Sequence, residues 1–458
     1  MQLPNQLKIP SFLQTLQFIT APVEFLDKVS QQHPDIFSSS FLLGQPAVFV
    51  QHPQALQELF TNDRKKFVLP PTKVVQPIVG EYSLLTLVGE HHKRQRKLLM
   101  PSFHGERMHH YGEIICNLTE KIFSQLPLNQ TFSAQTVTLE IALQFILQAV
   151  FGLHEGEKYE KLQHLLELMF GLFQSPLYSS FLYLPFLRKD LGGRSPWGRF
   201  VRFKQQIDEL LYSEITERRA QQKSERIDIL SLLMEAKDEE GQSMTNQELL
   251  NELMTLLFAG HETTGIAMAW GLYWTHHKPE VGERLRQELD SLGTSKDSTS
   301  IFRLPYLTAV CNEILRIYPV SAVTFPRVVK EPVELLEHSL EPGTMVIGSI
   351  YLTHHRAELY PQPDQFQPER FIERQYSQYE FLPFGGGMRR CIGEALAIFE
   401  IKLVLATILS HYQLTLVEHR PERPQLRGFN LAPGNGVKMT ITGQHRPQGS
   451  RKASATTV

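Results

Sequence analysis

Close to its C-terminal end the chain reads FGGGMRRCIG at positions 384–393, which sets one cysteine between a glycine-rich loop and the expected start of a helix. Glycine permits positive φ and lets the backbone approach a flat ligand closely. The first amides of a helix lack intrahelical acceptors, and together with the helix dipole they favour an ionised sulfur at Cys391. The alternative is a small buried hydrophobic cysteine, the commoner role of a free thiol. That alternative leaves the glycines and Arg389 unexplained.

The same segment carries the pattern Phe-x-x-Gly-x-Arg-x-Cys-x-Gly, with Phe384, Gly387, Arg389, Cys391 and Gly393 at its fixed positions. The chain therefore resembles the cytochrome P-450 family of haem-thiolate monooxygenases. The resemblance implies that Cys391 is the axial ligand of haem b, that Phe384 shields the sulfur and that Arg389 pairs with a haem propionate. A thiolate ligand pushes electron density onto iron and favours cleavage of the O–O bond of bound oxygen.

Length and composition fit one large globular domain. The chain has 458 residues, of which 42% are hydrophobic and 21% charged, and no linker divides it. We expect a single domain over residues 1–443 and a flexible tail over 444–458. The net charge of −2 gives no sign of the basic surface that binds nucleic acid, so no nucleic-acid partner is expected.

The cysteines Cys116, Cys311 and Cys391 are widely spaced and form no disulfide framework, which fits a reducing compartment. The chain lacks Cys-x-x-Cys-His, so we expect haem without covalent attachment. Residues 1–29 hold neither a signal peptide nor a run of about 20 apolar residues. We therefore expect a cytoplasmic monomer without a transmembrane anchor, similar to the soluble bacterial members of the family.

Helical periodicity dominates positions 90–320 and returns from 393 to about 411, whereas 47–50 and 345–352 read as strands. These patterns predict a fold that is mainly α with minor β. The resemblance implies a triangular α-rich domain with a smaller β-rich region.

The longest expected helix covers 245–278. Thr245 and Glu248 have capping-box spacing at its start, and Pro279 marks its end. A helix of this length would be ~50 Å long at ~1.5 Å per residue, enough to cross the whole domain. We therefore expect it to be buried in the core.

In the middle of this helix the chain reads AGHETT at positions 259–264, where glycine, a carboxylate and hydroxyls are unfavourable by propensity. Residues that are unfavourable by helix propensity, when they occur in a core helix, indicate a functional site. Thr263 could bond a carbonyl one turn back, and we expect the helix to be kinked or widened into a groove for dioxygen. The alternative is a helix-bonded threonine beside a solvated glutamate.

The family's oxygen-activation motif, Ala/Gly-Gly-x-Asp/Glu-Thr, is similar to this segment at every position. The resemblance implies that Thr263 donates a hydrogen bond to bound oxygen, that Glu262 is the proton-relay acid and that Ala259 contacts the haem. A zinc-protease interpretation of His261 and Glu262 fails, because the second histidine of His-Glu-x-x-His is replaced by Gly265.

Buried haem propionates need cationic partners. His92 and Arg96 fall where the family places propionate ligands on an early helix, although many members have tryptophan at the first of these positions. Histidine can still donate to a carboxylate. Arg327 and Arg389 are the other expected donors. Solvation at the surface would explain any one of them alone.

Glu313 and Arg316 are spaced i, i+3 on a helix opened by Pro305, a pattern that is usually a surface ion pair. They match the family's Glu-x-x-Arg motif, and Arg370 lies in the segment that supplies a second arginine. The resemblance implies a buried charged network that fixes the loop before Cys391.

The chain has no dinucleotide fingerprint and no cysteine cluster for iron–sulfur, so electrons must come from separate proteins. We expect a ferredoxin or flavodoxin with its reductase. A basic face could steer an acidic partner of this kind, although such a face is more often merely solvated. Its residues would be Lys93, Arg94, Lys97 and Arg390.

Predominantly apolar segments favour a lipophilic substrate such as a fatty acid, terpenoid or polyketide. The expected contacts are 68–87, 169–186, Ala259, Thr263, 321–324 and Leu431. Ordinary packing is the alternative for 169–186. Two other functions remain open: a haem-thiolate isomerase or peroxygenase that needs no external electrons, and a non-catalytic haem sensor.

Overall fold

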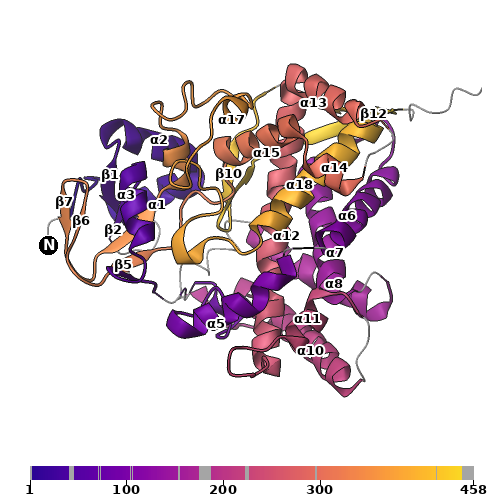
Figure 1. Cartoon of the computed structure of the whole chain (residues 1–458), viewed down its shortest axis with the longest axis horizontal. Coiled ribbons are helices and arrows are strands. Elements are labelled where there is room, and N and C mark those ends of the chain that lie inside the picture. Colours follow the sequence, from indigo (N-terminus) through magenta and orange to yellow (C-terminus); the bar gives the residue numbers. More distant parts are fainter. Residues whose placement is uncertain are drawn as a thin grey trace, which may run out of the picture.

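The computed structural model describes residues 3–40, 46–70, 72, 74–103, 105, 107–152, 155–174, 187–221, 226–293, 297–418 and 420–445. A large helical region surrounds one long central helix, and a smaller β-rich region lies at one side with the first helices of the chain (Figure 1). This arrangement confirms the predicted fold, which is mainly α with minor β. Residues 446–458 of the predicted tail lie outside the described residues.

The α-helices have these bounds: α1 Ser11–Thr20, α2 Pro22–Gln32, α3 Pro53–Thr61, α4 Gln76–Val79, α5 Gly89–Leu99, α6 Arg107–Ser124, α7 Ala134–Phe151, α8 Glu157–Gly171, α10 Pro196–Ala220, α11 Ile229–Glu235, α12 Asn246–His277, α13 Pro279–Ser291, α14 Ser298–Phe302, α15 Pro305–Ile317, α16 Ile350–His354, α17 Arg370–Glu373 and α18 Glu394–His411. Short 3-10 helices cover η1 Met100–Phe103, η2 Leu172–Gln174 and η4 Gly387–Arg389.

In the part of the chain that the structure describes, the strands form four small sheets. Their bounds are β1 Ile36–Ser39, β2 Ala47–Val50, β3 Phe67–Val68, β4 Thr131–Ser133, β5 Arg327–Val329, β6 Val333–Leu335, β7 His338–Leu340, β8 Met345–Gly348, β9 Tyr412–Leu416, β10 Pro424–Arg427, β11 Asn430–Pro433 and β12 Lys438–Gln444. The largest sheet has the order β1-β2-β8-β5-β3, in which β2 and β8 are parallel and the other pairs antiparallel. The predicted strand over 345–352 is wrong in its second half, because α16 begins at Ile350.

The central helix α12 has the predicted capping box. Thr245 Oγ1 accepts from the amide of Glu248 at 3.2 Å, and Glu248 Oε2 accepts from the amide of Thr245 at 2.7 Å. These two bonds satisfy amides that have no intrahelical acceptor. The helix is α-helical over all 32 residues, so the expected widening at 259–264 is wrong.

Helix α7 packs closely along α12. Thr138 Oγ1 donates to the carbonyl of Gly265 at 2.8 Å, and a Cβ at Gly265 would lie 2.8 Å from the side chain of Leu139. Glycine is therefore required at this crossing. Helix α7 is also apolar and long enough to cross a membrane, with a mean hydropathy of 1.4, but 78% of it is buried. It is a core helix of this domain.

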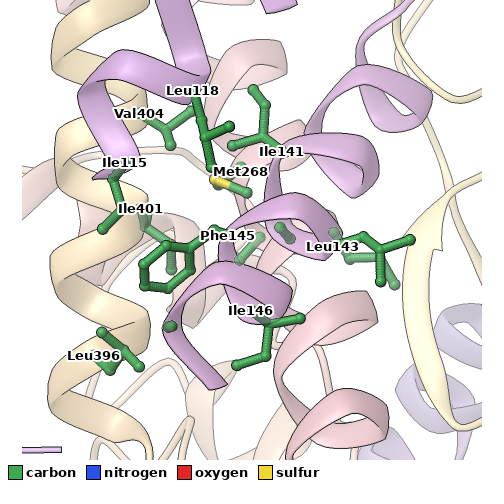
Figure 2. Close-up of a cluster of buried hydrophobic side chains, with 14 of the residues drawn as sticks. Ile115, Leu118, Ile141, Leu143, Phe145, Ile146, Met268, Leu396, Ile401 and Val404 are labelled. Carbon is green, nitrogen blue, oxygen red and sulfur yellow. The ribbon is translucent and has the colours of Figure 1, made fainter. Parts of the chain in front are cut away.

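Figure 2 shows where α6, α7, α12 and α18 bury their apolar side chains against one another. The labelled members of this cluster are Ile115, Leu118, Ile141, Leu143, Phe145, Ile146, Met268, Leu396, Ile401 and Val404. Burial of a side chain of this kind stabilises a fold by ~1.5–3 kcal/mol. This cluster fixes α18, which follows Cys391, against α12, which carries the AGHETT segment.

Candidate active site

The loop that carries Cys391 is closed by a hydrogen bond from the amide of Cys391 to the carbonyl of Phe384 at 3.0 Å. Gly385 and Gly387 have φ of +70° and +64°, a region that side chains rarely adopt. Helix α18 begins at Glu394, and the amide of Gly393 donates to the Cys391 thiol. The predicted placement of amide dipoles against the sulfur is therefore present.

The thiol of Cys391 is accessible although it lies deep in the protein. Burial raises its pKa and outweighs the Gly393 amide, which lowers it. The predicted effect of the backbone amides, which favours the ionised sulfur, is therefore present but smaller than the opposing effect of burial. Coordination to a metal deprotonates a thiol, so this environment suits a ligand better than a free nucleophile.

Gly386 and Gly387 let the loop pack against the end of α3. A Cβ at Gly386 would lie 2.4 Å from the ring of Phe60, and one at Gly387 would lie 2.0 Å from Asp63 Oδ2. Asp63 also accepts from the amide of Met388 at 2.8 Å. The glycines are therefore needed both for the backbone conformation and for this contact.

Arg327 is fully buried and directed to the same loop. Its guanidinium donates to both carboxylate oxygens of Asp63, and to the carbonyls of Gly386 at 2.8 Å and Phe325 at 2.7 Å. Arg327 was predicted as a propionate partner; in this structure one of its bonds reaches the cysteine loop directly at Gly386, and two bind Asp63, which contacts the same loop. Asp63 was missed by the sequence analysis, because no local pattern marks an acid whose partner lies 264 residues away.

A second group of side chains near the loop consists of two arginines and one histidine. Arg389 donates to the carbonyls of Leu84 and Leu87, and Arg96 donates to the carbonyl of Arg390 at 2.8 Å. Within the described residues, no ion pair joins either arginine to a carboxylate, and the buried Nδ1 of His92 has no hydrogen-bond partner. These three residues were predicted to be propionate partners, and that assignment stays a prediction.

The pKa values of this group confirm a crowded positive site. Burial, Arg327 and Arg96 lower the pKa of Arg389 to about 10, against a smaller opposing effect of Asp63. Burial, Arg389 and Arg96 lower the pKa of His92 to about 4. Two arginines whose charges destabilise each other, beside a neutral histidine that can donate a hydrogen bond, are a fitting environment for an anionic ligand such as a haem with its two propionates. The residues present therefore fit this cofactor.

Helix α12 presents an accessible face in the middle of its buried length. Residues 249–257 and 264–275 are buried, but Ala259 is exposed, and Gly260, Glu262 and Thr263 are partly exposed. Thr263 Oγ1 donates to the carbonyl of Ala259 at 2.6 Å, as the sequence predicted. The AGHETT segment is therefore the accessible part of an otherwise buried helix.

Glu262 is the acid of this face. Burial raises its pKa to about 7, while a hydrogen bond from Asn430 and the charge of Arg427 lower it. Asn430 Nδ2 donates to Glu262 Oε2 at 3.0 Å across 168 positions of sequence. A carboxyl with a pKa near 7 can both bind and release a proton at neutral pH. Asn430 was another residue that the sequence analysis missed.

The start of α12 also holds the loop over 80–87. Glu252 Oε1 accepts from the amide of Leu84 at 2.7 Å, Asn251 Oδ1 accepts from the amide of Tyr82 at 2.9 Å, and the hydroxyl of Thr255 contacts that of Ser83 at 2.6 Å. Burial raises the pKa of Glu252 to about 8. This loop supplies the carbonyls that bind Arg389, so α12 positions that arginine indirectly.

The predicted network of Glu313, Arg316 and Arg370 is present and buried. Arg316 forms two bonds with Glu313, at 2.7 and 2.9 Å, and Arg370 Nε lies 3.2 Å from the same carboxylate. Arg316 also donates to the carbonyl of His354 at 2.9 Å, and the ring of His354 accepts from the amide of Leu382 at 3.0 Å. The network thus reaches the backbone just before the cysteine loop.

The predicted basic face is not a free positive surface. Arg94 pairs with Asp238 at 2.6 Å and with Glu248 at 2.9 Å, and Arg390 pairs with Glu394 at 2.7 Å. Lys93 pairs with Glu90 and Lys97 with Glu239. The idea that these four side chains form a clear positive patch is therefore wrong.

The expected substrate segments have mixed outcomes. Residues 71, 73 and 175–186 lie outside the described residues. Leu431 is fully buried in a core cluster, and Met169 is also fully buried, which favours ordinary packing for both. Among the expected positions, Ala259 and Thr263 have accessible surface next to the acid.

Comparison with known proteins assigns the class. The family model described as Cytochrome P450, here written cytochrome P-450, matches residues 3–438, so the chain belongs to the cytochrome P-450 family and is a haem-thiolate monooxygenase. Curated relatives include cytochrome P-450 138 of Mycobacterium tuberculosis, 30% identical over 96% of each chain. Another is cytochrome P-450 135B1 of Mycobacterium bovis, 29% identical over 99% of this chain and 94% of the relative.

Among solved structures, the chain is similar to one described as retinoic acid bound cyanobacterial CYP120A1. The TM-score is 0.84 with 23% identity, and the match covers 96% of this chain and 99% of the other. At this identity the likeness shows the fold. The predicted family, fold and enzyme class are thereby confirmed.

Proposed function

We propose that this monooxygenase inserts one oxygen atom from O2 into a lipophilic organic substrate and receives electrons from a separate ferredoxin or flavodoxin with its reductase. The observation that carries the proposal is the pairing of two features: an accessible, deeply placed thiol at Cys391 and an accessible face of α12 that carries Glu262 and Thr263. A haem sensor would have no need of such an acid.

The cofactor of this proposal is haem b, held without a covalent link. Cys391 would hold the iron, and His92, Arg96 and Arg389 would face the propionates, with Arg327 supporting the loop. When bound, haem supplies the activation of O2 that lets one oxygen atom enter the substrate while the other leaves as water. Phe384 and the glycines keep the sulfur within a closed backbone loop.

Glu262 and Thr263 move protons in this proposal. The carboxyl of Glu262, with its pKa of about 7, takes up a proton and releases it on the accessible face of α12. The hydroxyl of Thr263 is held by the Ala259 carbonyl, so it must rotate away from that bond to donate elsewhere. The contacts of Glu262 with Asn430 and of Thr263 with Ala259 support these two proposed roles.

A lipophilic substrate is supported by the retinoic acid bound in the similar cyanobacterial structure. Retinoic acid combines a long apolar body with one carboxylate. A fatty acid shares that chemistry and is a suitable first probe. Terpenoids and polyketides are the other classes to screen.

The test is a reconstituted reaction under O2 labelled with oxygen-18. Haem-loaded protein is supplied with NADPH, a ferredoxin and its reductase, and lauric acid, and the product is analysed by mass spectrometry. We expect one labelled oxygen atom per product molecule and dependence on the reductase. Product formation without the reductase would indicate an isomerase or peroxygenase, and oxygen consumption without any product across a lipophilic panel would contradict the proposal.

A further inference from the structure

The hairpin formed by β10 and β11 ends in a tight turn close to α12. Arg427 and Asn430 are cross-strand partners in its register and flank the turn residues Gly428 and Phe429. Gly428 has φ of +57°, which the turn requires. The side chains of Arg427 and Asn430 thus leave the hairpin at its tip, one from each strand.

The hairpin is fixed to the core independently of these two side chains. The indole Nε1 of Trp270, on α12, donates to the carbonyl of Leu431 at 3.0 Å. The amide of Leu431 donates to the carbonyl of Val320 at 2.8 Å, and Leu431 is fully buried. The position of Asn430 relative to α12 is therefore set by the residue that follows it.

Both tip residues act on Glu262. Asn430 Nδ2 binds Oε2 of Glu262 at 3.0 Å, and among the described residues this is the carboxyl's one hydrogen-bond partner. Arg427 donates from Nη2 to the carbonyl of Gly434 at 2.9 Å, while its buried Nε has no partner in the described part of the chain. A positive charge with an unused donor therefore lies near the acid.

We propose that Asn430 and Arg427 are positioning residues for Glu262: Asn430 holds one oxygen of its carboxyl group, Arg427 supplies a positive charge close by, and the other oxygen is left to carry the proton. The inference rests on the proposed role of Glu262 and extends it to a hairpin far away in sequence. An amide N–H directed at Oε2 favours the ionised carboxylate, and so does the guanidinium. Burial has the opposite effect, because it raises the pKa of Glu262. The balance of these effects places that pKa at about 7.

Other groups around Glu262 do not replace these two. His261, its neighbour on α12, is buried with its pKa lowered to about 4, so it is neutral above that pH. The ring of His261 stacks on Phe170 of α8 with centroids 5.0 Å apart. Across the described residues, Arg427 on β10 is the charged side chain with a resolved effect on Glu262, and Asn430 on β11 is the polar one.

Infrared titration of the resting, haem-loaded protein tests this directly. The C=O stretch of the protonated Glu262 carboxyl is assigned as the band that E262Q removes. In N430L and in R427Q we expect the midpoint of this band to rise by about one pH unit, because each change removes a group that stabilises the ionised form. N435L, at an exposed asparagine in the next turn, and R423Q, at an exposed arginine, are matched controls that should leave the midpoint unchanged.

Turnover gives the second readout. The ratio of product to peroxide is followed against pH with lauric acid, NADPH, ferredoxin and reductase, and its midpoint should move in N430L and R427Q as the infrared midpoint does. If both midpoints stay in place while E262Q removes the dependence, the hairpin inference is wrong and the role of Glu262 stands. If E262Q itself leaves the ratio unchanged, the proposed proton carrier is wrong. Circular dichroism verifies that each variant folds. If N430L does not fold, R427Q, on the other strand of the hairpin, still tests the proposal.

Discussion

Asp63 and Arg327 form a bidentate ion pair, with Nε–Oδ1 at 2.8 Å and Nη2–Oδ2 at 3.0 Å, beneath the loop that carries the cysteine. Both side chains are buried, and Asp63 also binds the amide of Met388. One carboxylate thus connects the end of α3, strand β5 and the glycine loop.

The variant D63N should destabilise the protein strongly. Removing the charge leaves Arg327 buried without its counter-ion, which lowers the free energy of unfolding by roughly 3–5 kcal/mol. Urea unfolding measures the change. The control is E58Q, which breaks the half-exposed pair of Glu58, on α3, with Lys66, which lies beyond the end of that helix, and should destabilise the protein far less. Equal effects of D63N and E58Q would contradict the structural role given to Asp63.

Replacement of Thr263 by alanine should divert electrons to hydrogen peroxide. The expected ratio of peroxide to product rises by roughly tenfold or more, in line with the loss of a positioned proton-transfer group. The matched control is T275A, because Thr275 makes the same bond to a carbonyl one turn back at 2.8 Å but is buried in the packed part of α12. A normal yield of product per electron in T263A would refute the assigned role.

Loss of the thiol should abolish the spectral signature of the enzyme. Reduced C391A under carbon monoxide is expected to lack the red-displaced Soret band of thiolate-ligated haem, which the unchanged protein should show. C116A is the control, since Cys116 is a half-buried thiol near Thr407 that is distant in sequence from the loop. Persistence of the band in C391A would mean that another residue ligates the iron.

Glu252 should make stability depend on pH. Its pKa is about 8 in the folded protein against 4.5 for the free side chain, so the folded state binds the proton more tightly. Stability should therefore fall as pH rises from 4.5 to 8 by up to ~1.4 kcal/mol per unit. Urea unfolding between these pH values should show a flatter dependence in E252Q, whereas E90Q, at an exposed position, should match the unchanged protein. A slope that E252Q does not alter would show that another group is responsible.

Short-range signals explain what the sequence predicted well. The capping box of Thr245 and Glu248, the bond from Thr263 to Ala259 and the closed loop before Cys391 each depend on residues within a few positions of one another. Geometry at that range follows from helix periodicity and glycine conformations. The family resemblance then placed the buried Glu313 network, whose local spacing alone would suit a surface pair.

Long-range pairing explains the errors. The partners of Arg94 lie 144 and 154 positions away, so the sequence could not show that its charge is neutralised. The contact of Asn430 with Glu262 has the same origin. The error at Ile350 is different in kind: an apolar run of this length is ambiguous between strand and helix, and tertiary packing decides.

The gathering of Arg96, Arg389 and His92 around one interior space has a consequence for biosynthesis. A polypeptide that folds ahead of porphyrin supply holds the positive charges of Arg96 and Arg389 near each other, and capture of a dianionic porphyrin would relieve the repulsion between these two arginines. Ligation then raises stability by mass action, so maturation is linked to how much porphyrin the cell provides. Iron and porphyrin starvation should therefore lower the amount of this protein itself as well as its turnover.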